Sequence, residues 1–283
     1  MADNGEAKTK LRSSRPDFAS IGGLLVAIGA LLGGLILDGG KISDVTQITA
    51  AIIVLGGTLG AVMVTSPLSS LIGAVAGLKK VFFEDVIHTD AAIESIVAYA
   101  TKARKSSVIS LEEDLEKIED AFLKKALTLA VDGTDLHELR SMVELDLVQA
   151  ERRIEADAKV FESAGGYSPT IGIIGAVMGL IQVMKHLENI EEVGRGIAIA
   201  FVATVYGVAV ANLFFLPAAN KIKTRGQKET QLKELMVEGV AGILEGTNPK
   251  LIRVKLEAFL QKSAKPPKQA AESRAEAPAA ARG

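Results

Sequence analysis

The stretch Phe18–Leu37, which reads FASIGGLLVAIGALLGGLIL, decides the fold class of this 283-residue chain. It holds no charged residue and is bounded by Asp17 and Asp38. A bilayer core about 30 Å thick needs roughly 20 apolar residues of helix to cross it. The stretch is long for the apolar part of a signal peptide, and no small-x-small cleavage site precedes the polar turn 38–40. We therefore predict a retained transmembrane helix.

Three more runs of the sequence lack charged residues entirely. The first of these, 45–78, is too long for one simple span, and Pro67 divides it because proline lacks a backbone N–H and disfavours helix before it. We expect a membrane helix followed by an amphipathic segment, 68–83, along the membrane interface. The fold class is thus an all-α integral membrane protein with four transmembrane helices. The predicted spans are 18–37, 46–65, 166–187 and 196–219.

Charge outside the spans fixes the predicted topology. Lys and Arg gather before the first span, after the second and after the fourth, whereas the two other short loops hold few, so the positive-inside rule places both termini in the cytoplasm. The block 79–162 carries 19 acidic and 12 basic residues and has a polar helical pattern. The predicted parts outside the spans are a cytoplasmic N-terminus (1–17), a large cytoplasmic helical domain between spans two and three (84–162), cytoplasmic C-terminal helices (220–262) and a disordered tail (263–283).

The composition argues against an enzyme, a metal site and a nucleic-acid-binding surface. The chain has no cysteine, so thiolate metal sites and cysteine nucleophiles are excluded, and its three histidines lack metal-ligand spacing. No phosphate-binding glycine loop or catalytic triad is present. Neither the charged block 79–162 nor the basic region 220–283 carries the interleaved aromatic residues that nucleic-acid surfaces use. We expect no enzymatic activity, no metal site, no cofactor and no nucleic-acid partner.

Small residues recur at helical spacing along the spans. Such stripes let helix backbones approach closely in lipid, and they predict a tight bundle or an oligomer. The stripes are Gly23, Ala27, Ala30 and Gly34 in the first span, Ser168, Gly172, Gly175 and Gly179 in the third, and Gly196, Ala200, Ala203, Gly207 and Ala211 in the fourth.

No charged residue or histidine lies inside any of the four charge-free runs. Proton carriers normally keep an ionisable group at depth, so a proton acceptor would have to come from another chain. The polar groups that the fourth span does own include Thr204 and Tyr206. A threonine in a membrane helix also bonds its own backbone one turn back, which is the alternative for Thr204. The exposed cluster of Arg104 and residues 112–114 fits either a solvated face or a contact surface.

Long ordered strings carry a family resemblance. Residues 165–180 read GGYSPTIGIIGAVMGL, residues 198–207 read AIAFVATVYG, and residues 245–249 read EGTNP. These strings, together with four spans and a large insert between the second and third, closely resemble the A subunit of ion-driven motor stators, the MotA branch of the MotA/TolQ/ExbB family. Related ExbB/TolQ-type energisers of other envelope or gliding machines are the alternative, but they have three spans and a large part after the first.

The resemblance implies an assembly. In such stators five A subunits surround two copies of a MotB-type partner, whose single membrane helix bears the ion-accepting Asp. The complex sits in the bacterial inner membrane, and ion flow through it drives a FliG-like rotor protein. The absence of a carboxylate in the spans of this chain agrees with that arrangement.

The resemblance also implies roles for particular residues. The two functional prolines of the family, conformational hinges, fall on Pro169 and Pro217, and the pore-facing threonine falls on Thr204, with Tyr206 beside it in the pathway. The rotor-contacting arginine and glutamate fall on Arg104 and Glu112. Sodium-driven relatives place a hydroxyl at the position of Ala176, so the methyl group here favours protons over sodium as the coupling ion.

Overall fold

The computed structural model describes residues 12–185, 187–188 and 190–263. Nearly all of them are helical, and the chain divides into two compact units, each treated separately below. Residues 1–11 of the predicted N-terminal segment and nearly all of the predicted tail lie outside the described residues, as does residue 186 within the predicted third span. Four helical stretches are long and apolar enough to cross a membrane, which confirms the predicted number of spans.

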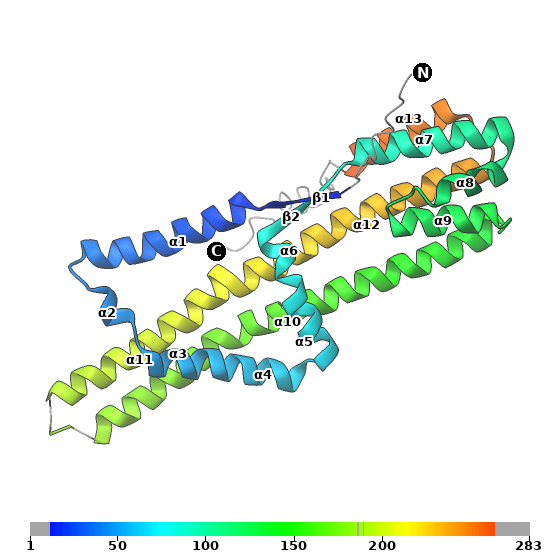
Figure 1. Cartoon of the computed structure of the whole chain (residues 1–283). Coiled ribbons are helices and arrows are strands. Elements are labelled where there is room, and N and C mark those ends of the chain that lie inside the picture. The colour runs from blue at the N-terminus through cyan, green and yellow to red at the C-terminus, as the bar shows by residue number, and fades with distance from the viewer. Residues whose placement is uncertain (1–11, 186, 189, 264–283) are drawn as a thin grey trace, which may run out of the picture. The chain divides into compact units, whose positions relative to one another are not determined.

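One unit contains residues 12–86 and 148–230 and holds the apolar helices. Figure 1 shows its elements in the colours of the chain. In order they are β1 (Arg12–Pro16), α1 (Phe18–Leu37), α2 (Ile42–Val45), α3 (Ile48–Ala51), the π-helical turn η1 (Ile52–Gly56), α4 (Gly57–Thr65), α5 (Leu68–Gly77), α6 (Lys79–Phe82), β2 (Phe83–Ile87), most of α10 (Leu136–Lys185), α11 (Ile190–Val210), the π-helical turn η3 (Ala211–Phe215) and the start of α12 (Leu216–Leu244).

The second unit contains residues 87–147 and 231–263. Its elements are α7 (Thr89–Ser106), the 3-10 turn η2 (Val108–Leu111), α8 (Glu112–Leu115), α9 (Ala121–Val131), the first turns of α10, the last turns of α12, and α13 (Pro249–Ser263). Its core is one cluster of aliphatic side chains from all these helices except α8, with Ile96, Leu127 and Met236 at its centre and fully buried.

Local sequence explains where several helices begin and end. Asp120 accepts hydrogen bonds from the first backbone N–H groups of α9, and Asp135 does the same for α10. Gly133, with φ of 82°, follows α9, and Gly246, with φ of 67°, follows α12. A positive φ suits glycine because it has no Cβ to clash. Helix α9 therefore ends at Val131 and α12 at Leu244, each two residues before one of these glycines.

Three features differ from simple expectation. A two-stranded sheet of β1 and β2 adds the only strands among the described residues. The third span is not a separate helix, because α10 continues without interruption from Leu136 to Lys185. The fourth span likewise continues through η3 into α12 rather than ending near Pro217.

Candidate functional site

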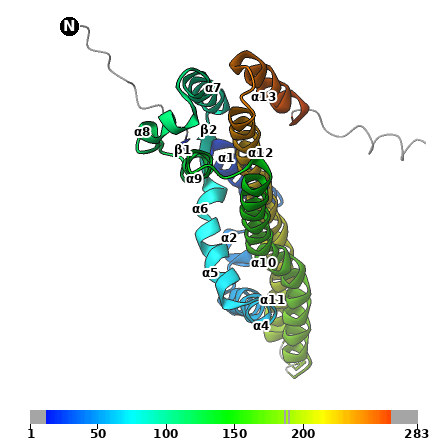
Figure 2. The same cartoon turned by 90° about the vertical axis from the view of Figure 1, so that its right-hand side faces the viewer.

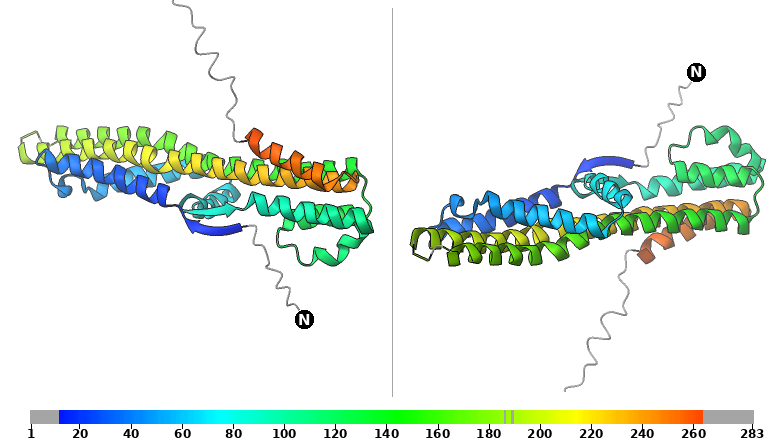
Figure 3. Two further views of the ribbon diagram at one scale, coloured as in Figure 1. Left: turned by 90° about the horizontal axis from the view of Figure 1, so that it is seen from above. Right: turned by 90° about the horizontal axis from the view of Figure 1, so that it is seen from below.

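The stripes of small residues in α10 and α11 face each other and form a close helix–helix seam. A Cβ added at Gly172 would lie 2.9 Å from the carbonyl oxygen of Ala203, and one added at Gly179 would lie 3.0 Å from the Cβ of Ala200. Gly175 is equally close to Ala203. Figure 3 shows this part of α10, in green, and α11, in yellow-green, side by side in both of its views. The seam therefore needs small residues because the two backbones nearly touch.

A buried hydrogen bond crosses the seam at Ser168. Its Oγ donates to the carbonyl oxygen of Gly207 at 3.0 Å, and the Ser168 side chain is fully buried. A Cβ at Gly207 would lie only 2.5 Å from the carbonyl oxygen of Ser168 and 3.2 Å from the Cα of Pro169. The seam is thus tightest beside Pro169, where α10 cannot form its regular backbone hydrogen bond.

The two prolines that the sequence predicts as hinges lie in continuous helix. Pro169 is half-buried at the seam, and it has no backbone N–H to donate to the carbonyl oxygen of Gly165, four residues earlier. Pro217 is exposed in the first turn of α12, directly after the π-helical turn η3. Both positions interrupt the regular hydrogen-bond ladder and are places where bending costs little.

Thr204 and Ala176 are both half-buried, in α11 and α10 respectively. The Thr204 Oγ1 lies 3.5 Å from the carbonyl oxygen of Ala200, one turn back in its own helix. That distance is long for a hydrogen bond between oxygens, so the hydroxyl is held only weakly. The bond expected of a lone membrane threonine is therefore present in a weak form.

The Tyr206 hydroxyl is occupied within the chain. It donates to the carbonyl oxygen of Val45 and accepts a hydrogen bond from the backbone N–H of Gln47 at 3.2 Å. These partners lie in the connection between α2 and α3, so Tyr206 joins α11 to the entrance of the second span. The sequence predicts Tyr206 in the ion pathway; the contacts seen here give it a structural task as well.

The two residues predicted to contact a rotor lie in the other unit. Arg104 lies in the last turn of α7 and Glu112 begins α8, and both are exposed. Neither forms an ion pair with any residue that the structure describes. Their neighbour Asp114 differs, because it accepts a hydrogen bond from the Lys102 Nζ at 2.6 Å and a second one from Lys117. Hydrogen bonds from Lys102 lower the pKa of Asp114.

Ser110 and Glu113 have the spacing of a capping box, S-x-x-E, which predicts a helix that starts at Leu111, and this prediction is wrong. Helix α8 starts after Leu111, and the Ser110 Oγ instead donates to the carbonyl oxygen of Ser107 at 2.7 Å. The physical reason is burial: Leu111 is only 1% exposed and belongs to the core, so the chain there turns as a 3-10 helix.

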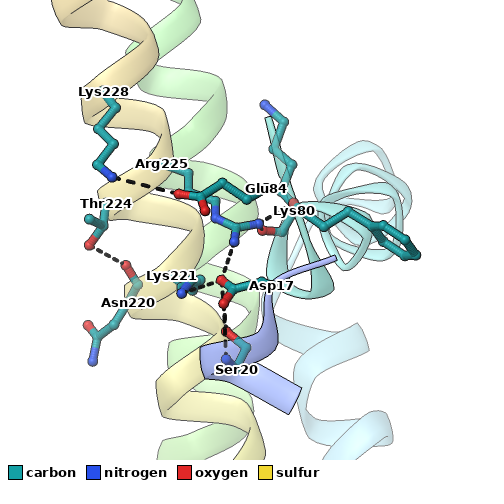
Figure 4. A network of polar contacts seen from close by, with 10 residues as sticks. Asp17, Ser20, Lys80, Glu84, Asn220, Lys221, Thr224, Arg225 and Lys228 are labelled. Carbon is teal, nitrogen blue, oxygen red and sulfur yellow. Dashed lines mark hydrogen bonds and ion pairs between the residues drawn. The ribbon is translucent and has the colours of Figure 1, made fainter. Parts of the chain in front are cut away.

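A buried ion cluster at the start of α1 was missed by sequence reasoning (Figure 4). Asp17 caps α1 by accepting hydrogen bonds from the backbone N–H and the hydroxyl of Ser20, at 3.0 and 3.1 Å. Its side chain also meets the Lys221 Nζ at 2.5 Å and the guanidinium of Arg225. Arg225 reaches two backbone carbonyls as well, those of residues 80 and 83.

The cluster keeps Asp17 ionised in spite of its burial. The Asp17 side chain is 6% exposed, and that burial by itself would raise the pKa of the carboxyl group. Hydrogen bonds from Lys221 and Ser20 outweigh the burial and hold the pKa well below its usual range. The sequence holds two local patterns, an Asp three residues before a serine at a helix start and two cations four residues apart in α12, but neither indicates that these residues meet.

Two family models match the chain. The MotA/TolQ/ExbB proton channel family matches residues 114–236, and the Motility protein A N-terminal family matches residues 21–107. Among curated proteins, Motility protein A of Bacillus subtilis (strain 168) is 36% identical over 248 residues, which are 86% of this chain and 91% of the relative. Chemotaxis protein PomA of Vibrio alginolyticus is 30% identical over 244 residues, 86% of this chain and 94% of the relative.

Solved structures match the fold. The chain aligns with the structure of C. jejuni MotAB with a TM-score of 0.82 and 30% identity, over 89% of this chain and 98% of that one. It aligns with the flagellar MotAB stator complex from Bacillus subtilis with a TM-score of 0.80 and 34% identity, over 88% of this chain and 100% of that one. The all-α membrane fold is therefore confirmed.

Proposed function

This chain belongs to the MotA branch of the MotA/TolQ/ExbB proton channel family, and from that premise we propose how it works as a subunit of a flagellar motor stator. Its partner is a MotB-type chain, with which it forms the ion channel. The match of the N-terminal family to residues 21–107 supports the stator over an ExbB/TolQ-type energiser.

One observation carries the proposal for the channel: the four charge-free runs contain no charged side chain and no histidine, although the family is one of proton channels. The α10–α11 seam supplies close packing, a weakly bonded hydroxyl at Thr204 and a proline beside the tightest contact. A proton-accepting carboxylate at depth must then come from the MotB-type helix. We propose that five copies of this chain surround two such helices in the bacterial inner membrane, with both termini in the cytoplasm and protons as the coupling ion.

In this proposal the prolines let the seam helices bend as each proton passes. Pro169 and Pro217 interrupt the regular backbone hydrogen bonding, and Thr204 faces the ion path. Motion would reach a FliG-like rotor protein through the exposed charges of Arg104 and Glu112.

The channel role is tested by Thr204→Val in cells that depend on this chain for motility. We expect lost or strongly reduced swimming and proton flux, with normal membrane insertion. Thr65→Val is a matched control, because the Thr65 Oγ1 bonds the carbonyl oxygen of Ala61 one turn back in another apolar helix. Equal behaviour of the two variants would contradict the role of Thr204.

The partner role is tested by reconstitution. Vesicles that contain this chain alone should conduct no protons, whereas vesicles with the chain and its MotB-type partner should. Full conduction by the chain alone would contradict the proposal that the partner supplies the proton-accepting carboxylate.

A further inference from the structure

The turn between α7 and α8 contains a strained residue. Ser107 has φ of 76° and ψ of 157°, and it is the one non-glycine residue with positive φ in the part of the chain that the structure describes. This backbone conformation is almost confined to glycine, because a Cβ clashes there. Such strain persists only where the surroundings hold it, and it often accompanies a surface that must keep one shape.

Packing on both sides holds the turn in place. Leu111 is buried and Val108 packs against the same core, while the backbone N–H and the Oγ of Ser110 both bond the carbonyl oxygen of Ser107, at 3.1 and 2.7 Å. In a 3-10 turn, residues three apart lie on one side. Val108 and Leu111 therefore point inward together, and Ile109 is left 65% exposed.

Charges of opposite sign flank this apolar tip. Arg104 and Lys105 precede the turn, and Glu112 and Glu113 follow it, all of them exposed. Lys102 lies 3.9 Å from Glu113 but is engaged mainly by Asp114. Figure 2 shows α8 on the side of α7 that faces away from α13, so the C-terminal helix does not cover this surface.

We propose that residues 107–111 form a rigid knob whose apolar tip, Ile109, docks into an apolar socket on the rotor protein. The socket would carry an acidic side chain opposite Arg104 and a basic one opposite Glu112. The inference rests on the proposed stator function and deepens it, because it adds an apolar contact to the predicted charged ones.

The physical need for such a contact follows from the exposure of the charges. Ion pairs between solvent-exposed side chains contribute little and are weakened by salt. An apolar side chain on a prestrained, anchored turn adds contact that salt does not screen, and it loses little conformational freedom on docking. The presence of both signs of charge favours a protein over an anionic lipid surface, which would attract only the cations.

The chain contains no cysteine, so single cysteines report cleanly on this contact. In motile cells that carry an epitope-tagged rotor protein, Ile109→Cys labelled with a thiol-directed photocrosslinker should form an adduct that contains the tag. Leu145→Cys, at a 58% exposed position of α10 in the same unit, should not. Adducts with lipid or with a second copy of this chain, equal adducts at both positions, or none at Ile109, would each overturn the knob.

Arg104→Cys separates this inference from the proposed function. If Arg104→Cys captures the tagged rotor protein and Ile109→Cys does not, the charged contact stands and the knob is wrong. If neither does, the rotor contact itself fails. In addition, Ile109→Ser should weaken binding of rotor protein to the solubilised stator roughly fivefold or more, as truncation of an interface anchor does, with Leu145→Ser unchanged. Equal binding by the two variants would contradict the knob.

Discussion

Helices α1 and α11 look alike in sequence, yet the structure holds them in different ways. Both are apolar and carry a stripe of small residues. In α11 the stripe is buried against α10, whereas no residue of α1 is buried and a Cβ added at Gly23 or Gly34 would meet nothing within 4 Å. Within its unit α1 lies close to α2, α6 and η3 (Figure 1). Helix α11 is held along its length by backbone contact with α10, whereas α1 is held by charge at Asp17, the residue before its first turn.

The difference shows what a small-residue stripe can predict. The stripe indicates that a face is suited to close approach in lipid, but it does not say which helix approaches. For α11 the partner is the preceding helix of the same chain. For α1 the single chain offers no helix along the stripe, so the buried Asp17 cluster is what fixes the start of the helix.

The largest expected effect is at the anchor of α1. Asp17→Asn leaves the nearly buried guanidinium of Arg225 and the partly exposed Lys221 without their carboxylate. Breaking a buried ion pair on one side costs about 3–5 kcal/mol. Hydrogen exchange should show opening at the start of α1 while the α10–α11 seam stays protected. Asp38→Asn, at the exposed far end of α1, is the matched control and should change little. Unchanged protection from hydrogen exchange at the start of α1 in Asp17→Asn would contradict the claim that charge holds this helix.

The same anchor has a defined pH dependence. Because the pKa of Asp17 is lower in the folded protein than in the unfolded chain, its contribution to stability is complete above the unfolded value, about 4, and is lost as pH falls through the lower folded value. The difference in unfolding free energy between wild type and Asp17→Asn should therefore be constant from about pH 5 to 8 and shrink only in stronger acid. Denaturation of the detergent-solubilised complex across that range measures it. A free-energy difference that already shrinks near neutral pH would contradict the ionised Asp17 cluster.

The second-largest loss of stability is expected from a substitution at the α10–α11 seam. Gly207→Ala places a methyl group 2.5 Å from the carbonyl oxygen of Ser168, and such overpacking costs about 1–3 kcal/mol. Thermal unfolding of the detergent-solubilised complex measures the loss. Gly29→Ala in α1, where an added Cβ meets nothing within 4 Å, is the control and should be neutral or slightly stabilising. Similar losses of stability in Gly207→Ala and Gly29→Ala would contradict the contrast between the packed α11 and the open α1.

A smaller effect is expected where α11 meets the second span. Tyr206→Phe removes a hydroxyl that joins Val45 and Gln47, with an expected loss of about 1 kcal/mol in unfolding free energy. Because the sequence also predicts Tyr206 in the ion pathway, proton flux should fall further than the loss of folded complex explains. A fall only in proportion to that loss would leave the hydroxyl with a structural role alone.

The smallest effect sharpens the comparison at the open stripe. Gly23→Leu should leave the stability of the single chain unchanged, because nothing lies within 4 Å of the added Cβ. Native electrophoresis of the complex then asks whether the stripe packs against another chain. Normal assembly would show that lipid alone faces this part of α1, and lost assembly would show that the stripe is an intermolecular counterpart of the seam.

The spans were predictable because lipid imposes a simple rule of length and missing charge. Helix α1 occupies the residues that the sequence predicts, Phe18–Leu37. The continuity of α10 through residues 165–166 was not predictable from local preference, since glycine weakens helices. Packing explains the glycine at 165 instead, because a Cβ there would lie 2.6 Å from the Leu216 side chain.

The candidate site was predictable in part. The strings around Pro169 and Thr204 identified the seam helices, and the stripe spacing identified their faces. The Asp17 cluster was not predictable, because Asp17 and Arg225 are 208 positions apart and no local pattern joins them. The misplaced capping box has the same origin: burial of Leu111, a tertiary effect, overrode a local signal.

The π-helical turn η3 sets an unusual rule for changes of chain length. Deleting one residue from an α-helix rotates every later side chain by about 100° and would turn an inward face outward. A π turn already carries one residue more than an α-helical turn, so a single deletion within Ala211–Phe215 can be absorbed by closing that turn into regular helix. Within the fourth span, Ala211–Phe215 is therefore a segment from which one residue can be deleted without rotating the flanking helix out of register.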